Sequence, residues 1–400
     1  MNQFTKDYNT THYQKTPEDL KATRGATILQ VLPSLGEGGG VERGTVEIAE
    51  AINYAGGRAI VASSGGQMVH DLTRIGADHF TLPMHSKNPW TMYKNISALK
   101  RLILKENIDL IHARSRAPAW SAFYASKDTG IPFITTFHGT YSRNNFLKSY
   151  YNSVMLKGRK VIAISNFIAG HMRQYYGIPI DNIRVIQRGV DIAKFDPKAV
   201  SAERVVSLAS DWRLPDDRSV IMLPGRLTRW KGQTVFIEAI AKLKRDDILA
   251  LIVGSAQGRN EYRNELETLI KSRGLSKTVR IIDHCNDMPA AYKLTDLVVS
   301  ASTAPEAFGR VIIEAQALGR PVIASDHGGA RETIVIGETG WLVEPNNPNN
   351  LADAITRALS LNTTERATLA EKTTKHIGKN FSKALMCQRT LSVYDEVLIK

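Results

Sequence analysis

The chain has 400 residues, 43% of them hydrophobic and 23% charged, which is the composition of an ordinary soluble globular protein large enough for two domains. No apolar run reaches the ~18 residues that span a bilayer, and two isolated cysteines, Cys285 and Cys387, exclude a disulfide framework and fit a reducing compartment. The net charge of +13 lies mainly in residues 1–215, where 27 Lys+Arg face 17 Asp+Glu, and this excess suits nucleic acid, anionic lipid or an acidic substrate.

Residues 1–25 form a polar segment that includes Asp7, Glu18 and Asp19. The segment lacks the apolar core of a signal peptide. We therefore expect a disordered N-terminal tail on a cytoplasmic protein.

Residues 26–198 alternate short, β-prone apolar segments with longer segments of helical periodicity. The expected strands are 27–33, 58–63, 79–82, 108–113, 133–137, 160–164 and 183–186. The expected helices are 41–55, 67–75, 91–106, 117–127, 146–157 and 165–176. This alternation predicts a doubly wound parallel sheet with helices on both faces, whose ligands lie at the carboxyl ends of the strands.

The alternation is interrupted at 199–218, a segment of mixed charge with Pro215, and we interpret it as a domain linker. A second β-α series occupies 219–383. Its expected strands are 220–223, 249–253, 279–282, 297–301, 321–324 and 341–343. A last helix is expected at 384–398, so the sequence predicts an α/β protein of two Rossmann-like, doubly wound domains.

Two glutamates of the second series, Glu306 and Glu314, flank the dipeptide Phe308-Gly309. The periodic apolar run around Glu314 predicts a helix that Gly319 ends, with Glu306 in the loop before it. A helix N-terminus favours anions, and two carboxylates beside it can accept hydrogen bonds from several hydroxyls. The pattern therefore favours a nucleotide sugar as ligand, although two arbitrary glutamates would more often be ordinary surface residues.

A basic turn, LPGRLTRWKG, places Arg226, Arg229 and Lys231 directly after an expected strand. Cations at the carboxyl end of a strand suit a diphosphate, which arginine binds in bidentate fashion and lysine as a point charge. The alternative is a solvated basic turn, and spacing alone does not decide between them.

Three features of the first series also lie at expected strand ends. The glycines Gly38, Gly39 and Gly40 form a loop between a strand and a helix, where backbone N–H groups can bind phosphate. His138 ends a strand, and Arg188 lies in the segment VIQRGVD. Each also has a structural interpretation, as a turn, a buried histidine or a surface arginine.

The stretch 141–160 contains five cations and no acid, with Phe146, Tyr150 and Tyr151 between them. This pattern suits an anionic membrane surface, or else a solvated helix face with its aromatic side chains in the core. The residues that we expect at an acceptor or membrane surface are Lys148, Lys157, Arg159, Lys160 and Arg188.

The chain resembles the family 4 retaining glycosyltransferases, whose two glutamates have this spacing around Phe-Gly and which share a Gly-Arg-x4-Lys-Gly element. The segments HARSRAPAWSA, TTFHGTY, LPGRLTRWKG, HCNDMPAAY and APEAFGR resemble a subgroup, the lipopolysaccharide core mannosyltransferases of α-proteobacteria. The resemblance implies the GT-B fold, in which two domains face each other across a cleft, with the acceptor domain at 26–198 plus a returning helix 384–400 and the donor domain at 219–383.

The resemblance also implies roles for individual residues. The catalytic group would be Glu306, His138, Arg226 and Lys231. The donor site would comprise Gly39, Gly40, Arg226, Lys231, Glu306, Phe308, Gly309 and Glu314. In it, Arg226 and Lys231 hold the diphosphate, Glu314 the ribose, and Glu306 and His138 the transferred sugar.

The implied reaction is transfer of a sugar, mannose from GDP-mannose as the first expectation, to a lipopolysaccharide-core or lipid-linked acceptor with retention of configuration. Front-face attack is expected, because no residue is assigned as a nucleophile. The sequence has no Asp-x-Asp triplet, so we expect no catalytic metal and no cofactor. The expected partners are the donor, the acceptor and the inner membrane, to which the protein would bind peripherally, and not nucleic acid. The alternatives are a nucleotide-sugar epimerase or phosphorylase of the same fold, and a basic nucleic-acid-binding protein.

Overall fold

The computed structural model describes residues 22–36, 39–141, 145–258 and 260–399. The chain forms two compact units. The first unit runs to Arg188 and also contains the chain from Lys383 onward, whereas the second unit is Gly189–Ser382. Most of the expected tail at 1–25 lies outside the described residues. No described helix is long and apolar enough to cross a membrane.

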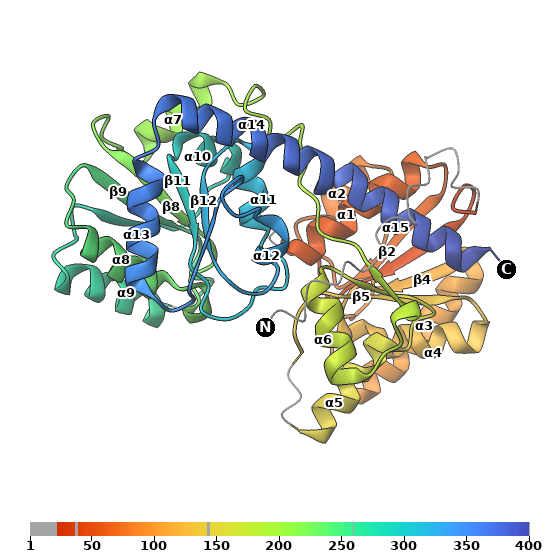
Figure 1. Ribbon diagram of the computed structural model, residues 1–400. Coiled ribbons are helices and arrows are strands. Elements are labelled where there is room, and N and C mark those ends of the chain that lie inside the picture. The colour runs from red at the N-terminus through yellow and green to blue at the C-terminus, as the bar shows by residue number, and fades with distance from the viewer. Residues whose placement is uncertain (1–21, 37–38, 142–144, 259, 400) are drawn as a thin grey trace. The chain divides into compact units, whose positions relative to one another are not determined.

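The first unit contains a seven-stranded parallel sheet in the order β3-β2-β1-β4-β5-β6-β7. Figure 1 labels its strands β2, β4 and β5. Its strands are β1 (Thr27–Val31), β2 (Arg58–Ser63), β3 (Asp78–Thr81), β4 (Leu110–Ala113), β5 (Phe133–Phe137), β6 (Val161–Ala163) and β7 (Ile183–Val185). Its helices are α1 (Gly40–Tyr54), α2 (Val69–Arg74), α3 (Pro89–Lys105), α4 (Arg116–Thr129), α5 (Phe146–Ser153), α6 (Asn166–Tyr176) and α15 (Lys383–Leu398). Helices α1, α2 and α15 share a buried apolar cluster with β1, β2 and β4 on one face, and α4 packs on β4 and β5.

The second unit contains a six-stranded parallel sheet in the order β10-β9-β8-β11-β12-β13. Its strands are β8 (Ser219–Pro224), β9 (Ile248–Val253), β10 (Val279–Ile282), β11 (Leu297–Ser300), β12 (Val322–Ser325) and β13 (Trp341–Val343). Its helices are α7 (Ala202–Asp211), α8 (Gln233–Leu243), α9 (Asn260–Ser272), α10 (Met288–Leu294), α11 (Arg310–Ala317), α12 (Ala330–Thr333), α13 (Pro348–Leu359) and α14 (Thr363–Asn380).

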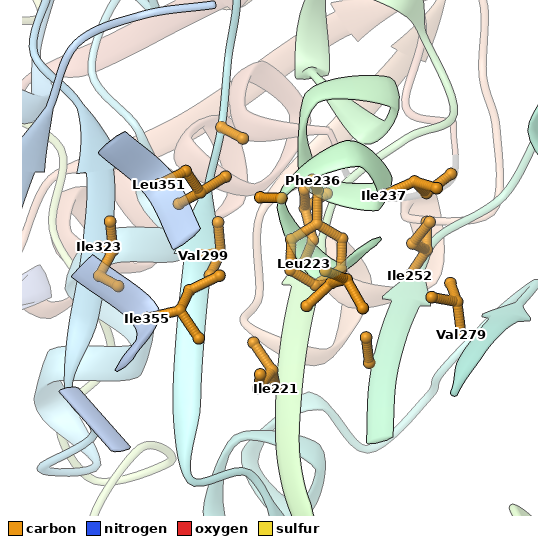
Figure 2. Close-up of a cluster of buried hydrophobic side chains, with 14 of the residues drawn as sticks. Ile221, Leu223, Phe236, Ile237, Ile252, Val279, Val299, Ile323, Leu351 and Ile355 are labelled. Atoms are coloured by element: carbon orange, nitrogen blue, oxygen red, sulfur yellow. The ribbon is translucent and has the colours of Figure 1, made fainter. Parts of the chain in front are cut away.

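One face of this second sheet is covered by α8, α9 and α13. Figure 2 shows Phe236 and Ile237 of α8 packed beside Leu223 and Ile252 of the central strands, and Ile355 of α13 belongs to the same cluster. All of these side chains are at most 1% exposed. Apolar packing against the helices therefore holds the central part of each strand in place. The loops that follow the carboxyl ends of the strands remain available for ligand contact.

The fold class is confirmed, since both sheets are parallel and each expected strand is present within a few residues of its predicted bounds. Gly319 also ends α11 as expected, with a φ of +69°.

The segment 199–218 differs from the sequence interpretation, because it is not an open linker. Ser201 caps α7 by accepting a hydrogen bond from the Arg204 backbone N–H at 3.3 Å. The Arg204 guanidinium then binds both carboxylate oxygens of Asp287, at 2.8 and 2.6 Å. Asp287 is the N-cap of α10, so α7 is attached to the second unit, and the crossover between the units lies at Arg188-Gly189 instead.

Candidate active site

An ion pair between Lys231 and Glu306 lies at the carboxyl edge of the second sheet. Lys231 Nζ is 2.8 Å from Glu306 Oε1, and each side chain is only 13% exposed. The Ser302 hydroxyl donates to the same carboxylate oxygen at 2.5 Å, and that of Ser300 does so at 3.4 Å. A carboxylate with these partners is held in one orientation and remains charged.

Gly232 brings the two halves of this pair together. It has a φ of +75°, and a Cβ on it would lie 1.7 Å from the carbonyl oxygen of Ala301, directly after β11. The Thr303 backbone N–H also donates to the Trp230 carbonyl at 2.8 Å. The turn after β8 therefore lies against the end of β11, and a residue with a side chain could not take the place of Gly232 without moving one of them.

The ionisation of Glu306 reflects two opposed effects. Burial raises its pKa, but the Lys231 ammonium and the hydrogen bonds from Lys231, Ser302 and Ser300 lower it more, so the pKa lies below its ordinary value of 4.5. Glu306 is therefore an anion at neutral pH. Because an anionic carboxylate only accepts hydrogen bonds, it suits the hydroxyls of a sugar.

Glu314 lies in α11 and is 7% exposed. The Tyr292 hydroxyl donates to Glu314 Oε2 at 3.1 Å, and the Arg310 guanidinium lies one turn earlier, with its Nε 3.6 Å from Glu314 Oε1. Gly309 precedes the helix with a φ of +90°, where glycine is favoured. The neighbouring Phe308 side chain is 3% exposed and packs against Phe381, so it is part of the core, whereas any contact with a sugar would involve its backbone.

A double-glycine turn supports the loop that carries Glu306. The Gly329 backbone N–H donates to the Glu306 carbonyl at 2.9 Å. A Cβ on Gly328 would lie 2.3 Å from that carbonyl oxygen, and one on Gly329 would lie 2.3 Å from the Cα of Phe308. Beside this turn, His327 has both ring nitrogens buried without a hydrogen-bond partner among the described residues, and it was not singled out from the sequence.

The three cations of the basic turn have different environments. Arg229 binds Glu265 with both terminal nitrogens at 2.5 Å and lies over the ring of Tyr262, with its side chain 67% exposed. Arg226 is exposed and forms no ion pair within the described part of the chain. Arg229 and Lys231 thus each have an acidic partner, Glu265 and Glu306, whereas the Arg226 guanidinium is exposed and can reach a phosphate.

The first unit places His138 and Arg188 together. His138 follows β5, Arg188 follows β7, and the Arg188 guanidinium donates to His138 Nδ1. Burial and the charges of Arg188 and Arg114 hold the pKa of His138 well below its ordinary value, so its ring is neutral. Because Nδ1 accepts, the proton lies on Nε2. Gly39 caps α1 and Gly40 begins it, whereas Gly38 lies outside the described residues.

The basic stretch 141–160 divides into two groups. Lys148 and Lys157 are exposed, and the Lys157 ammonium lies 5.4 Å from the centre of the Phe123 ring. By contrast, Arg159 donates to the Val397 carbonyl at 3.2 Å, and Lys160 forms an ion pair with Glu396 at 3.1 Å. Arg159 and Lys160 therefore hold α15 in the first unit, although Arg159 is itself exposed, as Lys148 and Lys157 are. Residues 142–144 lie outside the described residues.

Sequence reasoning missed the residues that support the two glutamates, namely Ser300, Ser302, Tyr292 and Arg310. Ser302 precedes Glu306 by four residues and Arg310 precedes Glu314 by four, so a local search around each glutamate could have found them. Tyr292 comes from a different helix, and no local signal indicates it.

Comparisons with protein families match both units. The family described as "Glycosyltransferase Family 4" matches residues 38–194, and the family described as "Glycosyl transferases group 1" matches residues 208–376. A D-inositol 3-phosphate glycosyltransferase of Salinispora arenicola is 30% identical over 312 residues, which are 72% of this chain and 69% of that protein.

Two solved structures extend the similarity over the chain. A glycosyltransferase from Rickettsia africae ESF-5 is 41% identical, with a TM-score of 0.88 over 94% of this chain and 99% of that chain. HepE of Anabaena in complex with UDP-glucose is 25% identical, with a TM-score of 0.81 over 92% of this chain and 99% of that chain.

Proposed function

This chain belongs to the group 1 and family 4 glycosyltransferases, and from that premise we propose the sugar, the acceptor and the residues of its reaction. It is an enzyme that takes a sugar from a nucleotide-sugar donor. We propose mannose from GDP-mannose as the donor and a lipopolysaccharide-core or lipid-linked molecule as the acceptor, with retention of configuration. The resemblance of five sequence segments to lipopolysaccharide core mannosyltransferases supports this choice.

The Lys231–Glu306 ion pair is the observation that carries the proposed mechanism. In the donor complex, Lys231 and Arg226 bind the diphosphate, and Glu306 accepts hydrogen bonds from hydroxyls of the transferred sugar. Glu314 accepts them from the ribose. Lys231 thus connects the group that leaves with the group that is transferred, and it stabilises the negative charge that develops on the diphosphate as the glycosidic bond breaks.

No residue in this arrangement is placed as a covalent nucleophile. Glu306 already accepts hydrogen bonds from Ser302 and Lys231, which lowers its pKa and its nucleophilicity. We therefore propose front-face attack, in which the departing phosphate takes the proton of the acceptor hydroxyl. Catalysis then depends on positioning and on charge stabilisation.

A panel of nucleotide sugars tests the proposed donor. A ligand that binds the native state raises the melting temperature, and we expect GDP-mannose to raise it more than UDP-glucose does. Product analysis with and without acceptor then separates transfer from epimerisation, which needs no acceptor. Protection by UDP-sugars alone would contradict the mannose assignment, and turnover without acceptor would contradict glycosyl transfer.

Removing metal ions should leave the reaction intact. Within the described residues, no three His, Cys, Asp or Glu side chains gather as metal ligands. Because we assign the positive charge on the diphosphate to Arg226 and Lys231, turnover in excess EDTA should remain at its original rate. Loss of activity in EDTA with recovery in magnesium or manganese would contradict this assignment.

We also propose that the first unit binds the surface of the inner membrane. Phe146, Leu147 and Tyr150 of α5 are 81%, 74% and 57% exposed, beside the exposed Lys148. Trp90 of α3 is 66% exposed, with the Lys94 ammonium 5.6 Å from its ring. Exposed aromatic side chains next to cations suit the headgroup region of an anionic bilayer.

A charge reversal tests this membrane contact. Changing Lys94, Lys148 and Lys157 to Glu should weaken binding to vesicles that contain anionic lipid, since each cation contributes about 1 kcal/mol there. Sedimentation with vesicles measures the change. Arg159 and Lys160 should be kept, because they bind α15.

The matched control changes Lys271, Lys372 and Lys375, which are exposed in the second unit, to Glu. This control has the same net charge as the test variant. Equal vesicle binding by the two variants would show that net charge alone matters and would contradict the proposed surface.

A further inference from the structure

Two arginines, Arg114 and Arg188, are buried at the carboxyl edge of the first sheet. Arg114 directly follows β4, Arg188 follows β7, and they are 2% and 7% exposed. The guanidinium groups of both arginines lie next to Gly44 of α1. A Cβ on Gly44 would lie 2.7 Å from Arg188 Nη1 and 2.9 Å from Arg114 Nη2. Two guanidinium groups are therefore held close together in the interior, and His138 lies against one of them.

The charge of Arg114 is poorly compensated within the described residues. Its Nη1 donates to the neutral amide oxygen of Gln30 at 3.2 Å, its Nε is buried without a partner, and no carboxylate forms an ion pair with it. Burial lowers the pKa of this guanidinium below its ordinary value, and Tyr394 and Glu47 offset that effect only in part. A buried cation whose charge is only partly compensated is unfavourable, and a bound anion would relieve it.

The neighbouring His112 is an example of a buried histidine in this region whose two ring nitrogens both have hydrogen-bond partners. His112 has its Nδ1 2.8 Å from the Tyr394 hydroxyl and its Nε2 2.7 Å from Thr136 Oγ1, so both nitrogens are satisfied. His138 differs, because its protonated Nε2 is buried and has only the Arg114 backbone as an imperfectly aligned partner. The open hydrogen-bond donor is thus Arg114 Nε, and the guanidinium group of Arg188 lies beside it.

We propose that Arg114 and Arg188 bind one anionic group of the acceptor, a phosphomonoester or a carboxylate. The identification of the ligand as the acceptor rests on the proposed function, in which Arg226 and Lys231 of the second unit take the donor diphosphate. Guanidinium groups bind both kinds of anion through paired N–H donors. The acceptor sugar is then an acidic or phosphorylated one, held by its charge.

Inorganic phosphate and acetate are the probes for this site. Each is added to the full-length protein, with sodium chloride at the same ionic strength as reference, and the melting temperature is recorded. A ligand at about a hundred times its Kd should raise the melting temperature by about 5 °C. Protection by phosphate supports a phosphomonoester and protection by acetate supports a carboxylate, whereas no protection by either overturns the proposal.

Variants locate the bound anion. Arg114→Gln should abolish the protection, and the double variant Arg226→Ala/Lys231→Ala should retain it. Gly44→Ala keeps both charges and puts a methyl group where the guanidinium groups lie, so it should also abolish protection and serves if Arg114→Gln does not fold. Protection that persists in Arg114→Gln and Gly44→Ala but disappears in the double variant would place the anion at the donor loop and overturn the proposal.

The melting temperature in the absence of phosphate or acetate shows whether Arg114 binds an anion or only stabilises the fold. In phosphate-free buffer, Arg114→Gln should melt at the same temperature as the parent or higher, because it removes a buried charge. If Arg114 only braced the fold, the variant would melt lower and keep its response to the anion. None of these readouts needs a donor or turnover, so failure of the subsite and failure of the proposed transferase reaction can be told apart.

Discussion

Replacing Lys231 with alanine is expected to lower kcat/KM for sugar transfer by about 10- to 150-fold. The estimate follows from the ~1.5–3 kcal/mol that a hydrogen bond to a charged group contributes, since each 1.36 kcal/mol is about a factor of ten in rate. Arg226→Ala should lose at least about tenfold for the same reason. Steady-state kinetics with the donor varied and the acceptor saturating measures both effects.

The Lys231 substitution should have a second consequence at Glu306. Lys231 is the main reason that the pKa of this buried carboxyl lies below its ordinary value. Without the ammonium group, the effect of burial is less opposed and the pKa rises. The pH below which activity falls should therefore be higher in Lys231→Ala than in the parent, which a pH profile of the residual activity would show.

Arg229 provides the matched control for this prediction. It is a cation in the same turn, two residues away, but it is held by Glu265 and exposed. Arg229→Ala should keep turnover within about twofold of the parent, since an ion pair between solvent-exposed side chains contributes little. Near-parental turnover in both Lys231→Ala and Arg226→Ala would remove the diphosphate assignment.

Gly232→Ala is expected to lower the free energy of unfolding by about 3 kcal/mol or more and to abolish donor binding. The new Cβ would lie 1.7 Å from the Ala301 carbonyl oxygen, which is a backbone atom and not the end of a flexible side chain. Either the turn after β8 or the end of β11 must shift, and both carry groups of the Lys231–Glu306 site. Urea unfolding and binding of the donor nucleotide measure the two effects.

Gly274→Ala separates this contact from backbone strain. Gly274 has a similar φ of +68°, but nothing lies within 4 Å of its Cβ position. Its replacement should cost only the strain of a left-handed residue, about 1–2 kcal/mol, and donor binding should be unchanged. Equal losses of stability in the two variants would show that strain, and not the contact with Ala301, makes glycine necessary at position 232.

The two parallel sheets could be predicted from the sequence, because strands that are buried on both faces appear as short apolar runs between turn residues. The sequence also placed Lys231 after one expected strand and both Glu306 and Glu314 after another, and it predicted the helix stop at Gly319. These features depend on local periodicity and on backbone conformations that few residues can adopt. The positions of the donor-site candidates were therefore predictable before any contact was known.

The pairing of the charged side chains could not be predicted without the tertiary contacts. Lys231 and Arg229 are equivalent in a basic turn, but one meets Glu306, 75 residues away, and the other meets Glu265. In the sequence, Arg159 and Lys160 have no evident partner, but in the structure both contact α15. The sequence of 199–218 suggests a linker, but in the structure Arg204 binds Asp287 and attaches this segment to the second unit. The spacing of charged residues along the sequence does not indicate which side chain each of them will pair with. The partner of a charged side chain depends on which residues the fold brings within hydrogen-bonding distance.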